Sequence, residues 1–239
     1  MNQDPRDLQK LLETVDVLRL VAQRGQQELH GFNWYMVIWG LYGALNLLAE
    51  LLLHRGFWGL LLFVAFFFST LPVAGPLPSL GIWLAVALLT YATYALTHLP
   101  WLTLAVIAVS ATVAYILAYR IGVQRQRCHL LPFKVALAPR IGWAWGMVMA
   151  GMALVFWTVI HLVPPDQIGT LSLILWGYAL GVGLFLSGLM HPGFFWLGIA
   201  AIFGIPLATA ISPVVGSWAY VAIALAMAGF GAYLYRQQP

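Results

Sequence analysis

The feature that most constrains this chain is a succession of long apolar stretches, separated by short segments rich in proline, glycine or charge. The hydrocarbon core of a bilayer is about 30 Å thick, and a helix needs roughly 20 residues to cross it. The stretches of about this length are 33–53, 57–74, 79–98, 101–119, 141–162, 168–190, 193–211 and 215–235. They predict an all-α fold, a polytopic transmembrane helical bundle of about eight spans.

The composition excludes a soluble domain. Hydrophobic residues make up 62% of the chain and charged residues 8%, whereas soluble domains carry roughly 45–50% and about 25%. No soluble fold of this length buries so much apolar surface, so the lipid bilayer must be the main solvent. The stretches are continuously apolar, which favours helices over the alternating strands of a membrane barrel.

The distribution of basic residues indicates which ends of the spans face the cytoplasm. Cytoplasmic loops of membrane proteins are enriched in Lys and Arg. If the N-terminus is cytoplasmic, every Lys and Arg except Arg55 falls in a cytoplasmic segment. An even number of spans also places Arg236 on that side. We therefore expect a multi-pass protein of a bacterial-type inner membrane, with both termini in the cytoplasm.

The first segment, residues 1–32, precedes the spans and has a different character. Between residues 5 and 30, apolar side chains recur every three or four residues, which predicts a cytoplasmic amphipathic helix. These side chains are Leu8, Leu11, Leu12, Val15, Leu18, Val21 and Ala22. The polar face mixes both signs of charge, unlike the basic face of a membrane-surface anchor. The helix either packs on the ends of the bundle or binds a protein partner.

The longest connection, residues 120–140, divides the spans into two groups of four, 33–119 and 141–239. This connection is basic and contains no acidic residue; its charges are Arg120, Arg125, Arg127, Lys134 and Arg140. Such a segment marks the cytoplasmic side and attracts anionic lipid headgroups, or it binds an anionic protein partner. A short loop held at a membrane surface does not indicate nucleic-acid binding.

Polar side chains near the expected outer ends of three spans form the main candidate site. The set comprises Asn46, Glu50, His54, Tyr94, His98 and His161. The first three lie at four-residue spacing and share one helix face. A carboxylate in a span usually faces the bundle interior or a wet cavity, so the set predicts an outward-facing polar vestibule. The alternative is that Glu50 reaches headgroup water, or pairs with His54 or Arg55.

The second half of the chain contains residues suited to close helix packing. Two small-residue faces are evident, Gly177, Gly181 and Gly188 in the sixth span and Ala222, Ala226 and Gly229 in the eighth. Such faces let helix backbones approach closely in lipid, within one chain or between two chains. Pro206 lies inside the seventh span and lacks an N–H donor, which predicts a kink that is either structural or a hinge.

Motifs of common enzyme classes are missing from the sequence. It has no phosphate-binding glycine loop, nucleophile elbow or zinc-binding HExxH motif. We therefore predict no catalytic residue, cofactor or metal site, and we do not expect an enzyme. The chain is interpreted as a non-catalytic accessory, regulatory or anchoring subunit of a membrane complex. The alternative is a small transporter for a neutral or amphipathic solute that uses the polar faces of the first and third spans.

Overall fold

The structure is a computed structural model that describes residues 5–54, 58–126, 137–160 and 162–237, and its regular elements are helices. They are α1 Pro5–Leu53, α2 Trp58–Ala74, α3 Pro76–Thr97, α4 Pro100–Gln126, α5 Leu137–Ile160, the short 3₁₀ helix η2 Pro165–Gln167, α6 Ile168–Ser187, α7 Pro192–Ile211 and α8 Pro213–Gln237. Proline begins five of the α-helices, because the N–H that it lacks has no intrahelical partner at that position. The prediction of an all-α bundle is confirmed.

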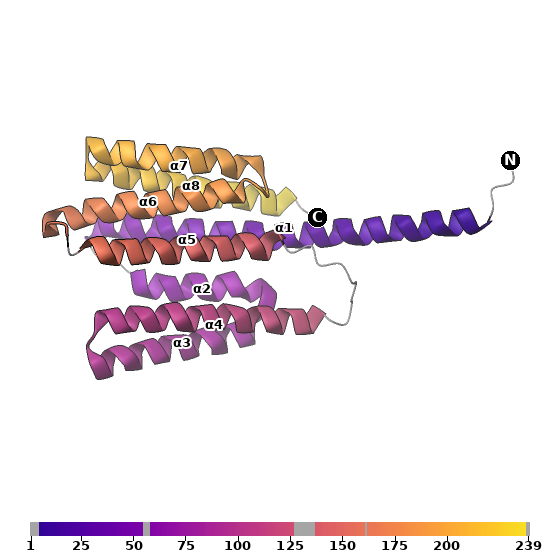
Figure 1. The fold of residues 1–239 in the computed structure, drawn as a ribbon, viewed down its shortest axis with the longest axis horizontal. Helices are drawn as coiled ribbons and strands as arrows, with labels where there is room; N and C mark the ends of the chain where they lie inside the picture. Colours follow the sequence, from indigo (N-terminus) through magenta and orange to yellow (C-terminus); the bar gives the residue numbers. More distant parts are fainter. Residues whose placement is uncertain (1–4, 55–57, 127–136, 161, 238–239) are drawn as a thin grey trace.

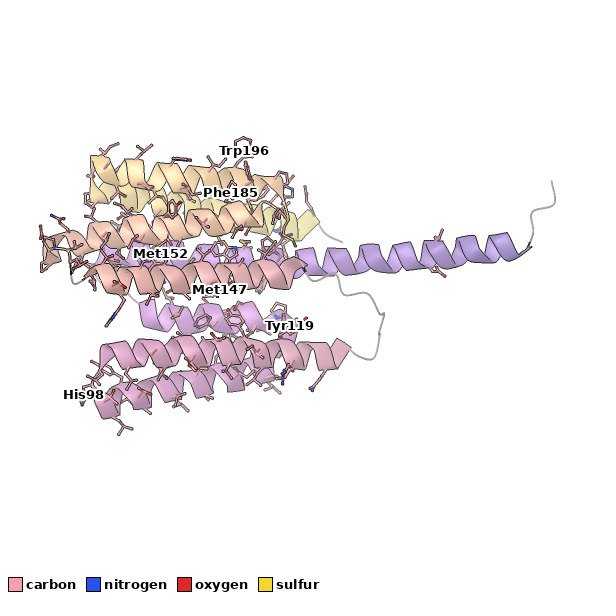
Figure 2. All side chains as sticks on the ribbon, viewed as in Figure 1. His98, Tyr119, Met147, Met152, Phe185 and Trp196 are labelled. Carbon is pink, nitrogen blue, oxygen red and sulfur yellow. The ribbon has the colours of Figure 1, made fainter. Side chains whose placement is uncertain are left out.

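Six helical segments are long and apolar enough to cross a membrane, by length and composition. They are Gly31–Leu53, Pro76–Thr97, Ala105–Gly122, Pro165–Ser187, Pro192–Ile211 and Pro213–Gln237. The described apolar parts of α2 and α5 are shorter, at Leu61–Ala74 and Ala144–Ile160. Large apolar side chains such as Met147 and Trp196, 71% and 67% exposed, project from the bundle (Figure 2). An apolar outer surface of this extent marks a membrane protein.

The helices of the bundle run side by side along one axis (Figure 1). α1, α3, α5 and α7 end at one end of the bundle, whereas α2, α4, α6 and α8 end at the other. The chain therefore reverses direction from each helix to the next. α1 extends past the end at which α8 finishes, so the first residues of α1 and the last residues of α8 lie on the same side of the bundle.

α1 and α8 pack against each other along most of the bundle. Gly40 permits this contact, since a β-carbon there would lie 2.6 Å from the carbonyl oxygen of Ala224. Met36 is fully buried, and Phe32 packs edge to face on Phe194 of α7 with ring centroids 5.7 Å apart. Close backbone approach increases dispersion contacts, which drive helix association in lipid.

The small-residue face of α6 packs against α7. A β-carbon at Gly177 would lie 2.6 Å from the Ile205 side chain, and one at Gly181 would lie 2.6 Å from Cγ1 of Ile202. A β-carbon at Gly188 would collide with Phe195. The GxxxG motif therefore serves packing inside the chain.

α8 packs through a different small-residue face from the predicted one. Ala222, Ala226 and Gly229 are exposed, and a β-carbon at Gly229 would meet no described atom within 4 Å. The buried small residues of α8 are Gly216, Ala224, Ala228 and Gly231. The small residues of both sets have a spacing that suits close helix packing. Spacing alone therefore does not predict which face of α8 packs on another helix.

α2, α3 and α4 pack on one another as a second group of helices. Trp83 of α3 lies at its centre: the ring stacks on Phe66 of α2 with centroids 4.4 Å apart, and Nε1 donates a hydrogen bond to Oγ1 of Thr70 at 2.8 Å. Tyr115 of α4 shares a 2.8 Å hydrogen bond with the hydroxyl of Ser69. In the described part of the chain, α2 is the member of this group that makes extensive contact with α1.

α1 differs from the expected pair of segments. The predicted amphipathic helix at 5–30 and the first span at 33–53 form one continuous helix of 49 residues. Gly25 does not end it, because one glycine costs only about 1 kcal/mol relative to alanine in a helix interior. The division into 33–119 and 141–239 stays a prediction, although α1 packs far more on α8 than on α2.

Candidate functional site

Asn46 is fully buried on α1. Its Nδ2 donates a 2.9 Å hydrogen bond to the backbone carbonyl of Tyr42, one turn earlier. Its Oδ1 has no hydrogen-bond partner among the described residues. A buried acceptor without a partner costs about 1–3 kcal/mol. Asn46 is therefore a polar group inside the helix packing.

Glu50 lies near the end of α1 and His54 follows the helix; both are exposed. Neither side chain makes a hydrogen bond or an ion pair with another residue that the structure describes. His54 comes directly after the last residue of α1, with a φ of 51° in the left-handed region. Arg55, the alternative partner for Glu50, lies outside the described residues.

Tyr94 and His98 lie at the end of α3, and both are exposed (Figure 2 for His98). Their rings meet edge to face with centroids 6.1 Å apart. His98 caps the helix with a φ of 52°, and its backbone N–H donates to the carbonyl of Tyr94 at 2.8 Å. The pair therefore has a clear local role in ending α3.

The described vestibule residues lie toward the C-terminal ends of α1 and α3, which share one end of the bundle, but α2 lies between these two helices. α3 packs on α2 and α4, whereas the part of α1 with Glu50 belongs to the α1–α8 group. His161 lies outside the described residues. Within the described ranges, no group of three His, Cys, Asp or Glu residues is arranged to hold a metal ion. A vestibule built from all six residues stays a prediction.

Two other predicted features are the basic connection 120–140 and a hinge at Pro206, and the structure describes them only in part. Arg120 is exposed on α4, but the side chains of Arg125, Arg127, Lys134 and Arg140 lie outside what the structure describes. α7 continues through Pro206 to Ile211, and a hinge at this proline stays a prediction.

An aromatic cluster that the sequence reasoning missed joins the two groups of helices. The Trp39 ring of α1 packs on Phe66 of α2 with centroids 5.4 Å apart. Phe66 in turn contacts Trp83 of α3 and Tyr115 of α4, so four helices meet at this ring. Trp34 of α1 adds a 2.9 Å hydrogen bond from Nε1 to the carbonyl of Phe68. The sequence carried only a weak signal for this cluster, since each of the first four apolar stretches contains several aromatic residues and their spacing does not mark the ones that meet.

The N-terminal half of α1 is the most distinctive external feature (Figure 1). It stands away from all the other helices, on the side of the bundle where α8 ends. At 1.5 Å per residue, the part between residues 5 and 30 is about 39 Å long. Val15, whose side chain the structure describes there, is 52% exposed. This segment can contact a second molecule without any change in the bundle.

No protein-family model, curated protein or solved structure matches this chain. Its function must therefore be argued from its own residues and packing.

Proposed function

We propose that this protein is a non-catalytic accessory subunit that anchors a protein partner at a membrane. The observation that carries this proposal is the single helix α1, whose C-terminal half is packed into the bundle while its N-terminal half projects from it. A helix held at one end by tertiary packing presents its free half in a defined direction. The bundle thus acts as the anchor, and the projecting half is the docking element.

All eight α-helices cross the bilayer in this proposal. α2 and α5 run beside helices of spanning length and take part in the same alternation of direction (Figure 1). Arg120 and Arg236 lie near the ends of α4 and α8, on the side from which α1 projects. By the positive-inside rule this side is cytoplasmic. The projecting helix and the basic connection 120–140 then lie together in the cytoplasm of a bacterial-type cell.

The alternative, a transporter for a neutral or amphipathic solute, rests on fewer observations. It is favoured by the buried and unpaired Oδ1 of Asn46 and by the proline inside α7. The described residues expected to line its path lie on α1 and α3, and α2 lies between these two helices. The Trp39 ring of α1 packs on Phe66 of α2 at the junction of the two helix groups, where a solute path would need space.

A deletion variant distinguishes the accessory function from the transporter function. A chain lacking residues 2–28 keeps the described packing of α1 on α8 and α2 within the bundle, so it should reach the membrane in normal amounts. The full-length protein, tagged at its C-terminus and purified in mild detergent, should carry a stoichiometric partner that the deletion lacks. A full-length protein that purifies alone and moves a solute across liposome membranes would overturn the accessory function.

A further inference from the structure

The face that α1 buries inside the bundle continues along its projecting half. Inside the bundle, the buried positions include Phe32, Met36 and Gly40, which follow one another at four-residue spacing. From Phe32 toward the N-terminus, a further series of positions follows at three- and four-residue spacing. Its apolar members are Leu29, Ala22, Leu18, Val15, Leu11 and Leu8, and Gly25 fills the remaining place. Positions with this spacing lie on one side of an α-helix.

Inside the bundle this face is covered mainly by α8. Gly40 meets the backbone of Ala224 and Ala228, and Gly43 meets the ring of Tyr220. α8 ends at Gln237, and Figure 1 shows α1 continuing beyond that point without a neighbouring helix. The apolar positions therefore continue from the interface between α1 and α8 into a part of α1 that no described element covers.

A second copy of this chain does not fit this face. Two copies in one membrane have the same orientation, so their α1 helices would run parallel. Paired helices lie about 8–10 Å apart, and each α1 continues directly into its own bundle. On this face, the space beside α1 at the bundle is already filled by α8. A second α1 would therefore meet α8 as soon as it entered the membrane.

We infer that the projecting half of α1 binds one amphipathic helix of a different polypeptide, which ends near the membrane surface and continues the line of α8. This inference rests on the proposed function and specifies its partner. The described chain contains equal numbers of acidic and basic residues between positions 5 and 30, namely Asp7, Glu13, Asp16 and Glu28 against Arg6, Lys10, Arg19 and Arg24. With no net charge on the segment, the apolar face supplies the main attraction.

Photo-crosslinking in cells tests which face is occupied. A benzophenone amino acid replaces Leu11, Val15 or Leu18 on the proposed face, or Gln9, Glu13 or Asp16 on the opposite face. We expect the first set to form an adduct with one separate polypeptide and the second set to form none. The crosslinked positions in that polypeptide, mapped by mass spectrometry, should recur every three or four residues, as one helix face requires.

A matched pair of leucine variants measures the contact independently. Leu18 and Leu20 differ by about 200° around the helix, so Leu18→Gln and Leu20→Gln remove the same side chain from opposite faces. We expect Leu18→Gln to reduce the partner that purifies with the protein by about tenfold, a typical effect of removing a buried leucine contact. Leu20→Gln should leave that amount unchanged.

The other outcomes overturn the inference in distinguishable ways. An adduct at twice the mass of the chain would show that a second copy occupies the face. Adducts from only the opposite face would contradict the inferred face and leave the accessory function intact. No protein adduct from any of the six positions, together with purification of the chain alone, would contradict both proposals.

Discussion

Asn46 illustrates how a single buried amide affects stability. Its Oδ1 is fully buried without a partner among the described residues. Asn46→Leu removes this unpaired acceptor at similar volume, and we expect it to raise the free energy of unfolding in detergent by about 1 kcal/mol. Asn46→Asp places a charge at the same position and should lower the midpoint of thermal unfolding. Intrinsic fluorescence during heating measures both, and a large loss of stability in the leucine variant would contradict the expectation.

His98 shows a different constraint, which comes from the backbone. Its φ of 52° lies in the left-handed region that favours glycine and disfavours β-branched residues. We expect His98→Gly to keep or raise the thermal midpoint, and His98→Val to lower stability by about 1–2 kcal/mol. If His98 has a further functional role, the glycine variant will lose that function while remaining stable. Equal stability of the two variants would contradict the backbone argument.

At the scale of helices, glycines decide which pairs approach closely. A β-carbon at Gly40 would lie 2.6 Å from the Ala224 carbonyl oxygen, whereas one at Gly31 of the same helix would meet no described atom within 4 Å. Gly40→Ala must therefore separate α1 from α8, and we expect it to lower stability by about 1–3 kcal/mol. Gly31→Ala is the matched control and should be neutral or slightly stabilising. Thermal unfolding of the two variants in the same detergent measures the difference.

At the scale of the whole molecule, the alternation of helix direction makes the topology testable. The proposed arrangement places Asp166 outside the cell and Gln124 in the cytoplasm; both side chains are exposed in the structure. With Cys128→Ser as the background, a cysteine at position 166 should react with a membrane-impermeant maleimide added to intact cells. A cysteine at position 124 should react only after the membrane is opened. Labelling of position 124 in intact cells would show that the topology is the reverse of the proposed one.

The sequence by itself determined the secondary structure and the environment of this protein. Helix formation is local, and the ends of the helices follow from residues within a turn of each boundary, such as Pro76, Pro192 and Pro213. A lipid environment follows from composition, because no packing arrangement hides so many apolar side chains from water. Small residues in α6 likewise predicted close packing, which the structure shows against α7.

The tertiary structure decided which helices become neighbours, and therefore which side chains meet. α1 packs on α8 because Gly40 and Ala224 let their backbones approach, a match between residues far apart in the chain. α2 separates α1, which carries Glu50, from α3, at whose end His98 lies, although sequence spacing placed both residues near one membrane surface. Periodicity defines the faces of one helix, but contact between two faces depends on shape complementarity and relative position, which only the folded bundle contains.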